Sequence, residues 1–357
     1  MAITASMVKE LRELTGAGMM DCKKALTETN GDMDAAVEVL KKSGAAKAEK
    51  KAARIAAEGI AKVAIDGNTA VVVEVNSETD FVAKNAIFQE FVQAVADKAL
   101  TVDTEKAGDG EDVVSILDMK ADLDDKILKI GEKISIRRFE KVTADVVASY
   151  IHGGGRIGVL VAGNGASDDA AKEALTNIAM QIAAMNPQYI SRADMADEEV
   201  AKLREITVDS ALNDPASLPK PILNKLIEKA VADVWSAEDV AIYEEKKSNM
   251  QYLFNFLSKE AAAQLAEIAM ADKETIAADK IFNGLVEGRV SKQLKEICLL
   301  DQTYVKAEDG KQSVAKYLAS VNKDLAIKKF VRFEVGEGME KKNEDFAAEV
   351  AAQMANA

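Results

Sequence analysis

Residues 59–75, GIAKVAIDGNTAVVVEV, decide the fold that we expect for this chain. The two halves of this stretch are short runs rich in valine, isoleucine and alanine. Between them lies Asp66-Gly67-Asn68, and glycine and asparagine are residues that tight hairpin turns prefer. The stretch therefore predicts two antiparallel strands joined by a tight turn.

Three further elements are expected to follow this hairpin. A helix near 85–100 carries an apolar stripe at helical spacing, and a second helix is expected near 111–129. In the segment KISIRRFEKV, at 133–142, apolar and polar residues alternate in part, which predicts a returning strand. The first part of the core would thus contain two strands, helices and a third strand.

The same order of elements recurs later in the chain. VVASYIHGGGRIGVLVAGN, at 146–164, predicts a second strand pair that turns at its glycines. A helix is expected over 168–185, and KKFVRFEV, at 328–335, resembles the earlier returning strand in composition and phase. We infer an internal duplication. Each half would bury one face of a small antiparallel sheet under helices, so the predicted class is α+β.

The N-terminal residues 4–43 predict a compact bundle of three short helices. Gly44 is expected to stop the third helix, because glycine often follows the last helical residue. Met19 and Met20 fit either the bundle core or an adaptable contact surface, and the pattern alone favours the core. A unit this small is expected to dock on a partner or on the rest of the chain.

A nearly all-helical stretch between Pro187 and about Leu285 interrupts the second part of the core. It predicts an inserted helical hairpin or a small helical subdomain. Trp235, the only tryptophan, lies in this insert and is expected to be a local core residue. The final segment, NEDFAAEVAAQMANA at 343–357, predicts a terminal helix.

Composition and charge narrow the classes of partner. The 357 residues carry a formal net charge of −14, which argues against nucleic-acid binding because that binding relies on positively charged surfaces. The most basic stretch, 41–54, lacks interleaved aromatic residues and is interpreted as a solvated helical linker. Two distant cysteines fit a reducing compartment, and no signal peptide or membrane span is recognised. The predicted location is cytoplasmic.

Enzyme motifs are incomplete in this sequence. The order of residues around Gly310-Lys311 does not match a phosphate-binding P-loop. His152-Gly153-Gly154-Gly155 resembles an oxyanion-hole string, but His152 is the only histidine and G-x-S-x-G is missing, so an esterase is excluded. A histidine-based zinc site is improbable for the same reason. We expect no catalytic residue, no metal site and no cofactor on this chain.

One polar stretch fits two interpretations. Phe81 lies between the strand ending at Val75 and the helix near 85–100, in a loop that is otherwise largely polar. In the first interpretation, Phe81 or Val82 packs on the following helix, which Asn85 or Thr79 caps. In the second, Phe81 protrudes as an aromatic anchor that enters a pocket of a partner. Sequence physics alone favours the first.

Several ordered motifs resemble the elongation factor Ts family. They are TGAGMMDCKKAL at 15–26, TDFVA at 79–83, the stretch from His152 to Leu160, and RFEVGEG at 332–338. The resemblance covers residues 1–190 and about 284–357. It implies a UBA-like N-terminal module of three helices, a duplicated core, an inserted helical hairpin and a C-terminal helix.

The resemblance also implies a function and a partner. The chain would be a guanine-nucleotide exchange factor for elongation factor Tu, in its GDP-bound or nucleotide-free state, and any magnesium would belong to that partner. The motif residues implied to intrude beside the nucleotide and magnesium site of the partner are Thr79, Asp80, Phe81 and Val82. Those implied to contact other parts of the partner are Leu11, Met19, Met20, Lys23, His152 and Val286.

Pattern and resemblance together suggest a division of the chain and leave alternatives open. The expected parts are an N-terminal module and linker (1–54), a first core subdomain (55–143), a second one (144–190 and 284–336), an insert (191–283) and a C-terminal helical module (337–357). The insert is longer than a simple hairpin needs, so homodimerisation through it stays open. A helical scaffold would leave Asp80-Phe81 unexplained, and an RNA-binding role would rest on 41–54.

Overall fold

The hairpin at residues 59–75 is present and organises the larger of two compact units. The computed structural model describes residues 3–108 and 111–340. Strands β1 (Glu58–Asp66) and β2 (Thr69–Ser77) pair antiparallel, with Asp66 opposite Thr69. The two turn residues are Gly67 and Asn68, and Gly67 has a φ of 57°, a left-handed conformation that glycine adopts without strain. The predicted turn is therefore confirmed.

Two antiparallel sheets form the core of this unit. The first has the order β1-β2-β4-β3 and the second the order β5-β6-β7. The bounds of the remaining strands are β3 Lys106–Ala107, β4 Ile134–Thr143, β5 Val146–His152, β6 Ile157–Asn164 and β7 Ala326–Glu334. The predicted strands and the α+β class are confirmed. The repeated strand order fits the proposed duplication, which itself stays a prediction.

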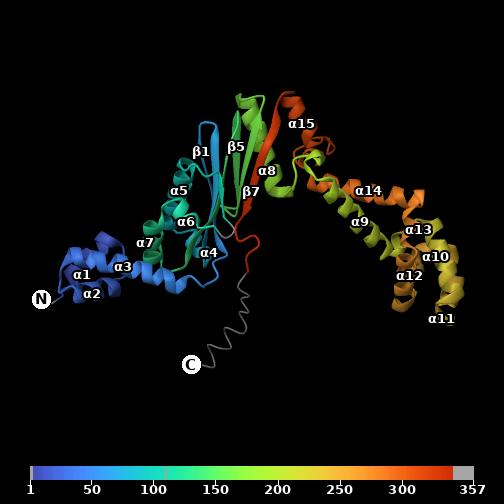
Figure 1. Ribbon diagram of the computed structural model, residues 1–357, viewed down its shortest axis with the longest axis horizontal. Coiled ribbons are helices and arrows are strands. Elements are labelled where there is room, and N and C mark those ends of the chain that lie inside the picture. Colours follow the sequence, from blue (N-terminus) through green and yellow to red (C-terminus); the bar gives the residue numbers. More distant parts are fainter. Residues whose placement is uncertain (1–2, 109–110, 341–357) are drawn as a thin grey trace. The chain divides into compact units, whose positions relative to one another are not determined.

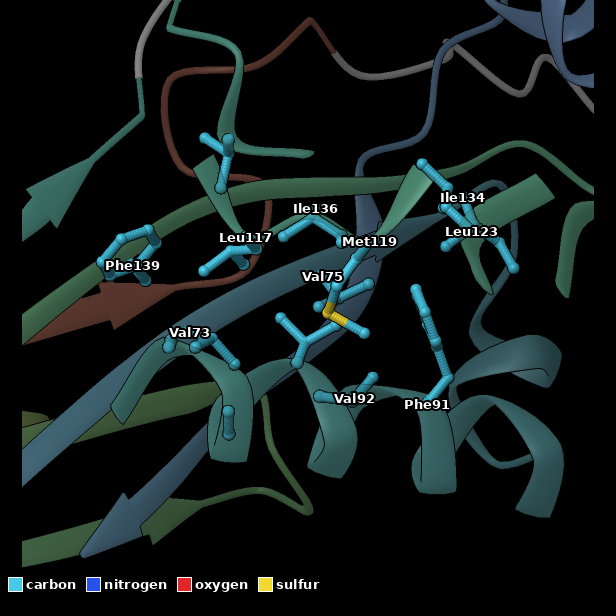
Figure 2. Packing of buried hydrophobic residues seen from close by; sticks show 14 of the residues in the cluster. Val73, Val75, Phe91, Val92, Leu117, Met119, Leu123, Ile134, Ile136 and Phe139 are labelled. Carbon is cyan, nitrogen blue, oxygen red and sulfur yellow. The ribbon is translucent and has the colours of Figure 1, made fainter. Parts of the chain in front are cut away.

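Strand β2 is buried on both faces, which explains its continuous apolar run. On one face, side chains of β2 and β4 pack against α5 (Ala86–Thr101) and α7 (Lys120–Ile130), as Figure 2 shows for Val73, Val75, Phe91 and Val92. On the other face, residues such as Val72 meet Leu160 and Phe333 of the second sheet. The second sheet also packs against α8 (Asp169–Met185). Figure 1 shows these layers.

The helix expected near 111–129 is two helices, α6 (Val113–Ile116) and α7. Asp118 breaks it with a φ of 51°, a left-handed conformation that aspartate tolerates better than most residues. The break allows both Leu117 and Met119 to be buried in the same core, which one straight helix would not do.

The three N-terminal helices are α1 (Ala5–Thr15), α2 (Met19–Glu28) and α3 (Met33–Lys51). Thr4 caps α1 by accepting from the amide of Met7 at 3.3 Å, and Asp32 caps α3 by accepting from the amide of Ala35 at 3.0 Å. Their buried side chains form a core of their own, joined by Leu128 of α7. The three predicted helices are confirmed, and the UBA-like resemblance stays a prediction.

The predicted stop at Gly44 is wrong, because α3 runs through it to Lys51. Gly44 is buried against α7, where a Cβ atom would meet the carbonyl oxygen of Asp124 at 3.2 Å and the Cβ of Leu128 at 3.6 Å. The glycine thus permits close approach of two helices instead of ending one. The basic stretch 41–54 is helical as far as Lys51.

We expect Gly44→Leu to lower the free energy of unfolding by about 1–3 kcal/mol, because the larger side chain overpacks the contact between α3 and α7. Thermal denaturation, together with hydrogen exchange of α3, measures this. Gly288→Leu is the matched control: Gly288 also lies within a helix, but a Cβ atom added there would have nothing within 4 Å. Equal effects of the two substitutions would contradict the packing role of Gly44.

The second compact unit comprises Pro187–Thr303 and Ala307–Val314, whereas the first comprises Met1–Asn186, Tyr304–Lys306 and Ala315–Ala357. Trp235 is buried in the helical core of this second unit, and its indole N–H donates to the carbonyl of Ala261 at 3.0 Å. The expected core role of Trp235 is confirmed. The α-helices of this unit are α9 Asp197–Leu212, α10 Lys220–Asp233, α11 Ala237–Lys246, α12 Lys259–Ala271, α13 Lys273–Ala277 and α14 Lys280–Ile297.

The unit extends past the predicted end of the insert at 283. Phe282, Val286, Val290 and Leu294 of α14 lie in one buried row and pack in the core of the helical unit, so α14 continues across that limit. Helix α15 (Val314–Val321) precedes β7. The predicted terminal helix at 343–357 lies outside the described residues, and the proposed division into domains stays a prediction.

Candidate partner-binding site

Phe81 is the most exposed of the large apolar side chains in the described part of the chain. It belongs to α4 (Asp80–Ala83), a single turn between β2 and α5, and 78% of it is exposed. Its neighbour Val82 is only 8% exposed and packs in the core between the first sheet and its helices. The first interpretation, that Phe81 or Val82 packs, is therefore confirmed through Val82, whereas Phe81 itself is exposed. Asn85 caps α5 as expected, accepting from the amide of Ile87 at 2.8 Å.

Asp80 is paired within its own turn. Its carboxylate accepts from the Lys84 ammonium at 2.8 Å, and that ammonium lies 5.9 Å from the centre of the Phe81 ring. The hydrogen bond from Lys84 is the main reason that the pKa of Asp80 is lowered. The ion pair is thus formed above the ordinary pKa of an aspartate and is lost only as the pH falls through the lowered value. At neutral pH, Asp80 is ionised.

A carboxylate from a distant turn holds the residue before Asp80. The Thr79 amide donates to Glu132 Oε2 at 3.0 Å, and the Thr79 hydroxyl donates to Glu132 Oε1 at 2.8 Å. Ser77 Oγ donates to the carbonyl of Thr79 at 3.0 Å. Glu132 was not among the predicted site residues, because the two partners are 53 residues apart and no local motif marks the pair.

The N-terminal module presents an apolar surface. Met19 and Met20 are 57% and 73% exposed, and Leu14 and Lys23 are exposed as well. The core interpretation of the two methionines is therefore wrong, because Cys22, Ala25 and Leu26 fill the inward face of α2 instead. Leu11 is fully buried in the module, so its side chain is unavailable for the predicted contact with a partner.

The two remaining predicted contact residues differ in their availability. His152 is exposed at the end of β5, where the Tyr150 hydroxyl lies 3.1 Å from its Nδ1. A groove of about 410 Å³ lies beside this hairpin, lined in part by Ile60, Ile65 and Ile151. Val286 is fully buried in the core of the helical unit, so its side chain is unavailable for direct contact.

The basic stretch 41–54 is engaged within the chain. Lys47 pairs with Asp21 at 2.7 Å, and Arg54 pairs with Glu78 at 3.2 Å. The Lys51 ammonium donates to the carbonyl of Gly131. The stretch is helical as far as Lys51, as interpreted, but these contacts give three of its cations a structural role, so those three side chains are not simply solvated.

Among the described residues, we find no group of three or more histidine, cysteine, aspartate or glutamate side chains that could hold a metal ion. In the same ranges, no helix has the length and apolar character required to cross a membrane. Exposed apolar side chains are present on α2, at Met19 and Met20, and on α4, at Phe81.

Comparison with known proteins identifies the family. The family model described as elongation factor TS matches residues 78–256 and 248–337. Elongation factor Ts of Clostridioides difficile (strain 630) is 42% identical over 360 residues, which cover 99% of this chain and 99% of the relative. The chain belongs to the elongation factor Ts family. It is therefore a translation elongation factor, and the matched region includes both the Thr79–Val82 loop and β7.

Proposed function

We propose that this translation elongation factor is a guanine-nucleotide exchange factor that binds elongation factor Tu carrying GDP and releases the nucleotide. The exposure of Phe81 carries this proposal. An aromatic side chain that is 78% exposed, next to an ionised carboxylate, lacks a role in the core of its own chain and suits insertion into a pocket. The factor itself would perform no covalent chemistry.

In the proposed mechanism, the side chains of Asp80 and Phe81 act together as a wedge. Phe81 and Asp80 would enter beside the magnesium and phosphate site of the GTPase and displace the elements that support the metal. Loss of the partner's metal would weaken phosphate binding, so GDP would leave and GTP could bind. If the factor weakens GDP binding, GDP must weaken factor binding by the same ratio, so the complex with both is transient.

The decisive experiment measures release of a fluorescent GDP analogue from elongation factor Tu, chased with excess GDP. Catalytic amounts of this protein should accelerate the release. A partner-binding scaffold without exchange activity would bind elongation factor Tu and leave the release rate unchanged. That result would overturn the proposed function.

The methionines of α2 are proposed to form a second contact with the partner. We expect the double substitution Met19→Ser and Met20→Ser to weaken binding to elongation factor Tu about 10- to 100-fold, because it removes the exposed apolar area of two adaptable side chains. Titration calorimetry measures the affinity. Met185→Ser is the matched control, since Met185 is an exposed methionine of α8. An unchanged affinity in the double variant would exclude this contact.

A further inference from the structure

The helix that carries Phe81 is too short to hold its own shape. Helix α4 has four residues, and the hydrogen bonds of a single turn do not offset the entropy of ordering it. Thr79 occupies its N-cap position in an extended conformation, yet its side chain makes no capping hydrogen bond. What keeps the turn in place must therefore lie outside α4.

The hydroxyl and the amide of Thr79 both point to Glu132. They bind the two oxygens of one carboxylate, at 2.8 and 3.0 Å, so the backbone and the side chain of Thr79 are fixed together. Hydrogen bonds to a charged acceptor are stronger than those between neutral groups. Glu132 thereby fixes the N-cap residue of α4 from outside the helix, although it binds none of the free amides of the helix itself.

The turn that carries Glu132 is itself anchored to the loop of Phe81. Glu78 accepts from the amide of Lys133 at 2.5 Å and pairs with Arg54 at 3.2 Å. The Lys133 ammonium donates to the carbonyls of Ala52 and Arg54, each at 2.7 Å. Two carboxylates thus cross between the turn and the loop in opposite directions. This arrangement fixes both segments.

We infer that Glu132 is a positioning residue for the Asp80-Phe81 wedge and acts through Thr79. A wedge that is already ordered loses less conformational entropy on binding, so more of its contact energy is available to displace elements of the partner. This inference rests on the proposed exchange function. It adds the residue that keeps the wedge in its binding conformation.

The first test uses the free protein and two substitutions. In Glu132→Ala, we expect the Thr79 amide to exchange its hydrogen about 10- to 100-fold faster by NMR, because a charge-assisted hydrogen bond is lost. Glu132→Gln retains one acceptor oxygen and should show a smaller increase. Glu173→Ala, at an exposed glutamate of α8, is the control and should leave the Thr79 amide unchanged. Unchanged Thr79 exchange in Glu132→Ala would overturn the inference.

The second test measures how Glu132 and Phe81 interact energetically in GDP release from elongation factor Tu. At a saturating concentration of this protein, Glu132→Ala should lower the rate of GDP release about tenfold or more. The same substitution should lower the rate much less when Phe81 is already alanine. A purely structural role would instead give independent, additive losses. Additive losses would therefore contradict the inference. If Glu132→Ala fails to fold, Thr79→Val takes its place. This substitution removes only the hydroxyl and should reproduce part of the effect.

The two tests separate the inference from the proposed function. If the unmodified protein fails to accelerate GDP release, the exchange function is wrong and with it the wedge. The hydrogen-exchange result on Thr79 then still shows whether Glu132 orders the loop.

Discussion

Phe81→Ala is expected to slow catalysed GDP release roughly 30- to 1,000-fold, the effect of removing a side chain that contributes about 2–4 kcal/mol at the centre of an interface. The free energy of unfolding should change by less than about 0.5 kcal/mol, because 78% of the side chain is exposed in the free protein. The measurements are the release of a fluorescent GDP analogue and thermal denaturation of the same preparations.

The chain offers a matched control for this substitution. Phe256 is 53% exposed, belongs to the helical unit and lies over the Lys246 ammonium at 4.5 Å. Phe256→Ala removes the same atoms and should leave the release rate unchanged. If Phe81→Ala keeps full activity, the exchange function can stand, but the wedge must lie elsewhere on the interface.

Local signals in the sequence were sufficient to predict most strands and helices of the core. The hairpin was predictable because Gly67 and Asn68 separate two apolar runs, and its register follows from a two-residue turn. The helix after Phe81 was predictable because its apolar residues recur at helical spacing and Asn85 caps it. These features depend on residues that are near one another in the chain.

The errors share a different physical cause, which is that exposure depends on tertiary contacts. Gly44 was predicted to end a helix because glycine often does so, but it is buried against α7, a helix far along the chain. Met19 and Met20 are apolar, but the small core of the N-terminal module is already filled by other residues. The family resemblance implied that Leu11 and Val286 contact the partner, whereas their full burial could not be predicted without the fold.

Long-range polar partners were equally inaccessible to sequence reasoning. Glu132 looks like an ordinary turn residue, and its bond to Thr79 exists only because β4 returns beside β2. Glu74 interrupts an apolar strand, which by itself suggests an outward-facing residue of a half-exposed sheet. It is instead completely buried between the sheet and the segment that follows β7.

Glu74 is the centre of a buried ionic cluster. Its carboxylate accepts from Arg137 at 3.0 Å, from Arg138 Nε at 2.6 Å and from the Gly336 amide at 2.8 Å. Arg138 in turn lies 4.2 Å from the centre of the Phe333 ring. Gly336 can approach this closely because it has no side chain: a Cβ atom there would lie 2.3 Å from the carbonyl oxygen of Ala57. The cluster therefore joins β2, β4 and the end of β7.

Glu74→Gln is expected to lower the free energy of unfolding by about 3–5 kcal/mol, because it removes the carboxylate charge that two largely buried guanidinium groups share and leaves Arg138 only the more exposed Glu337, at 3.4 Å. Differential scanning calorimetry measures the loss. Hydrogen exchange should rise in β2, β4 and β7, and peptides from α10 in the other compact unit serve as the internal reference.

Glu140→Gln is the matched control, because it also removes the charge of a buried carboxylate but leaves cationic partners that are exposed to water. Glu140 is also a buried glutamate of the first sheet, but its partners are Lys106 at 3.7 Å and Lys329 at 2.6 Å, and both lysine side chains remain substantially exposed. Water can solvate those ammonium groups when the carboxylate is removed, so a loss of only about 1 kcal/mol is expected. The guanidinium groups of Arg137 and Arg138 have much less access to water, since their side chains are only 17% and 15% exposed. Similar losses in the two variants would mean that the cluster at Glu74 is no stronger than the partly solvated ion pairs of Glu140, and that apolar packing contributes more than this cluster to the contact between the two sheets.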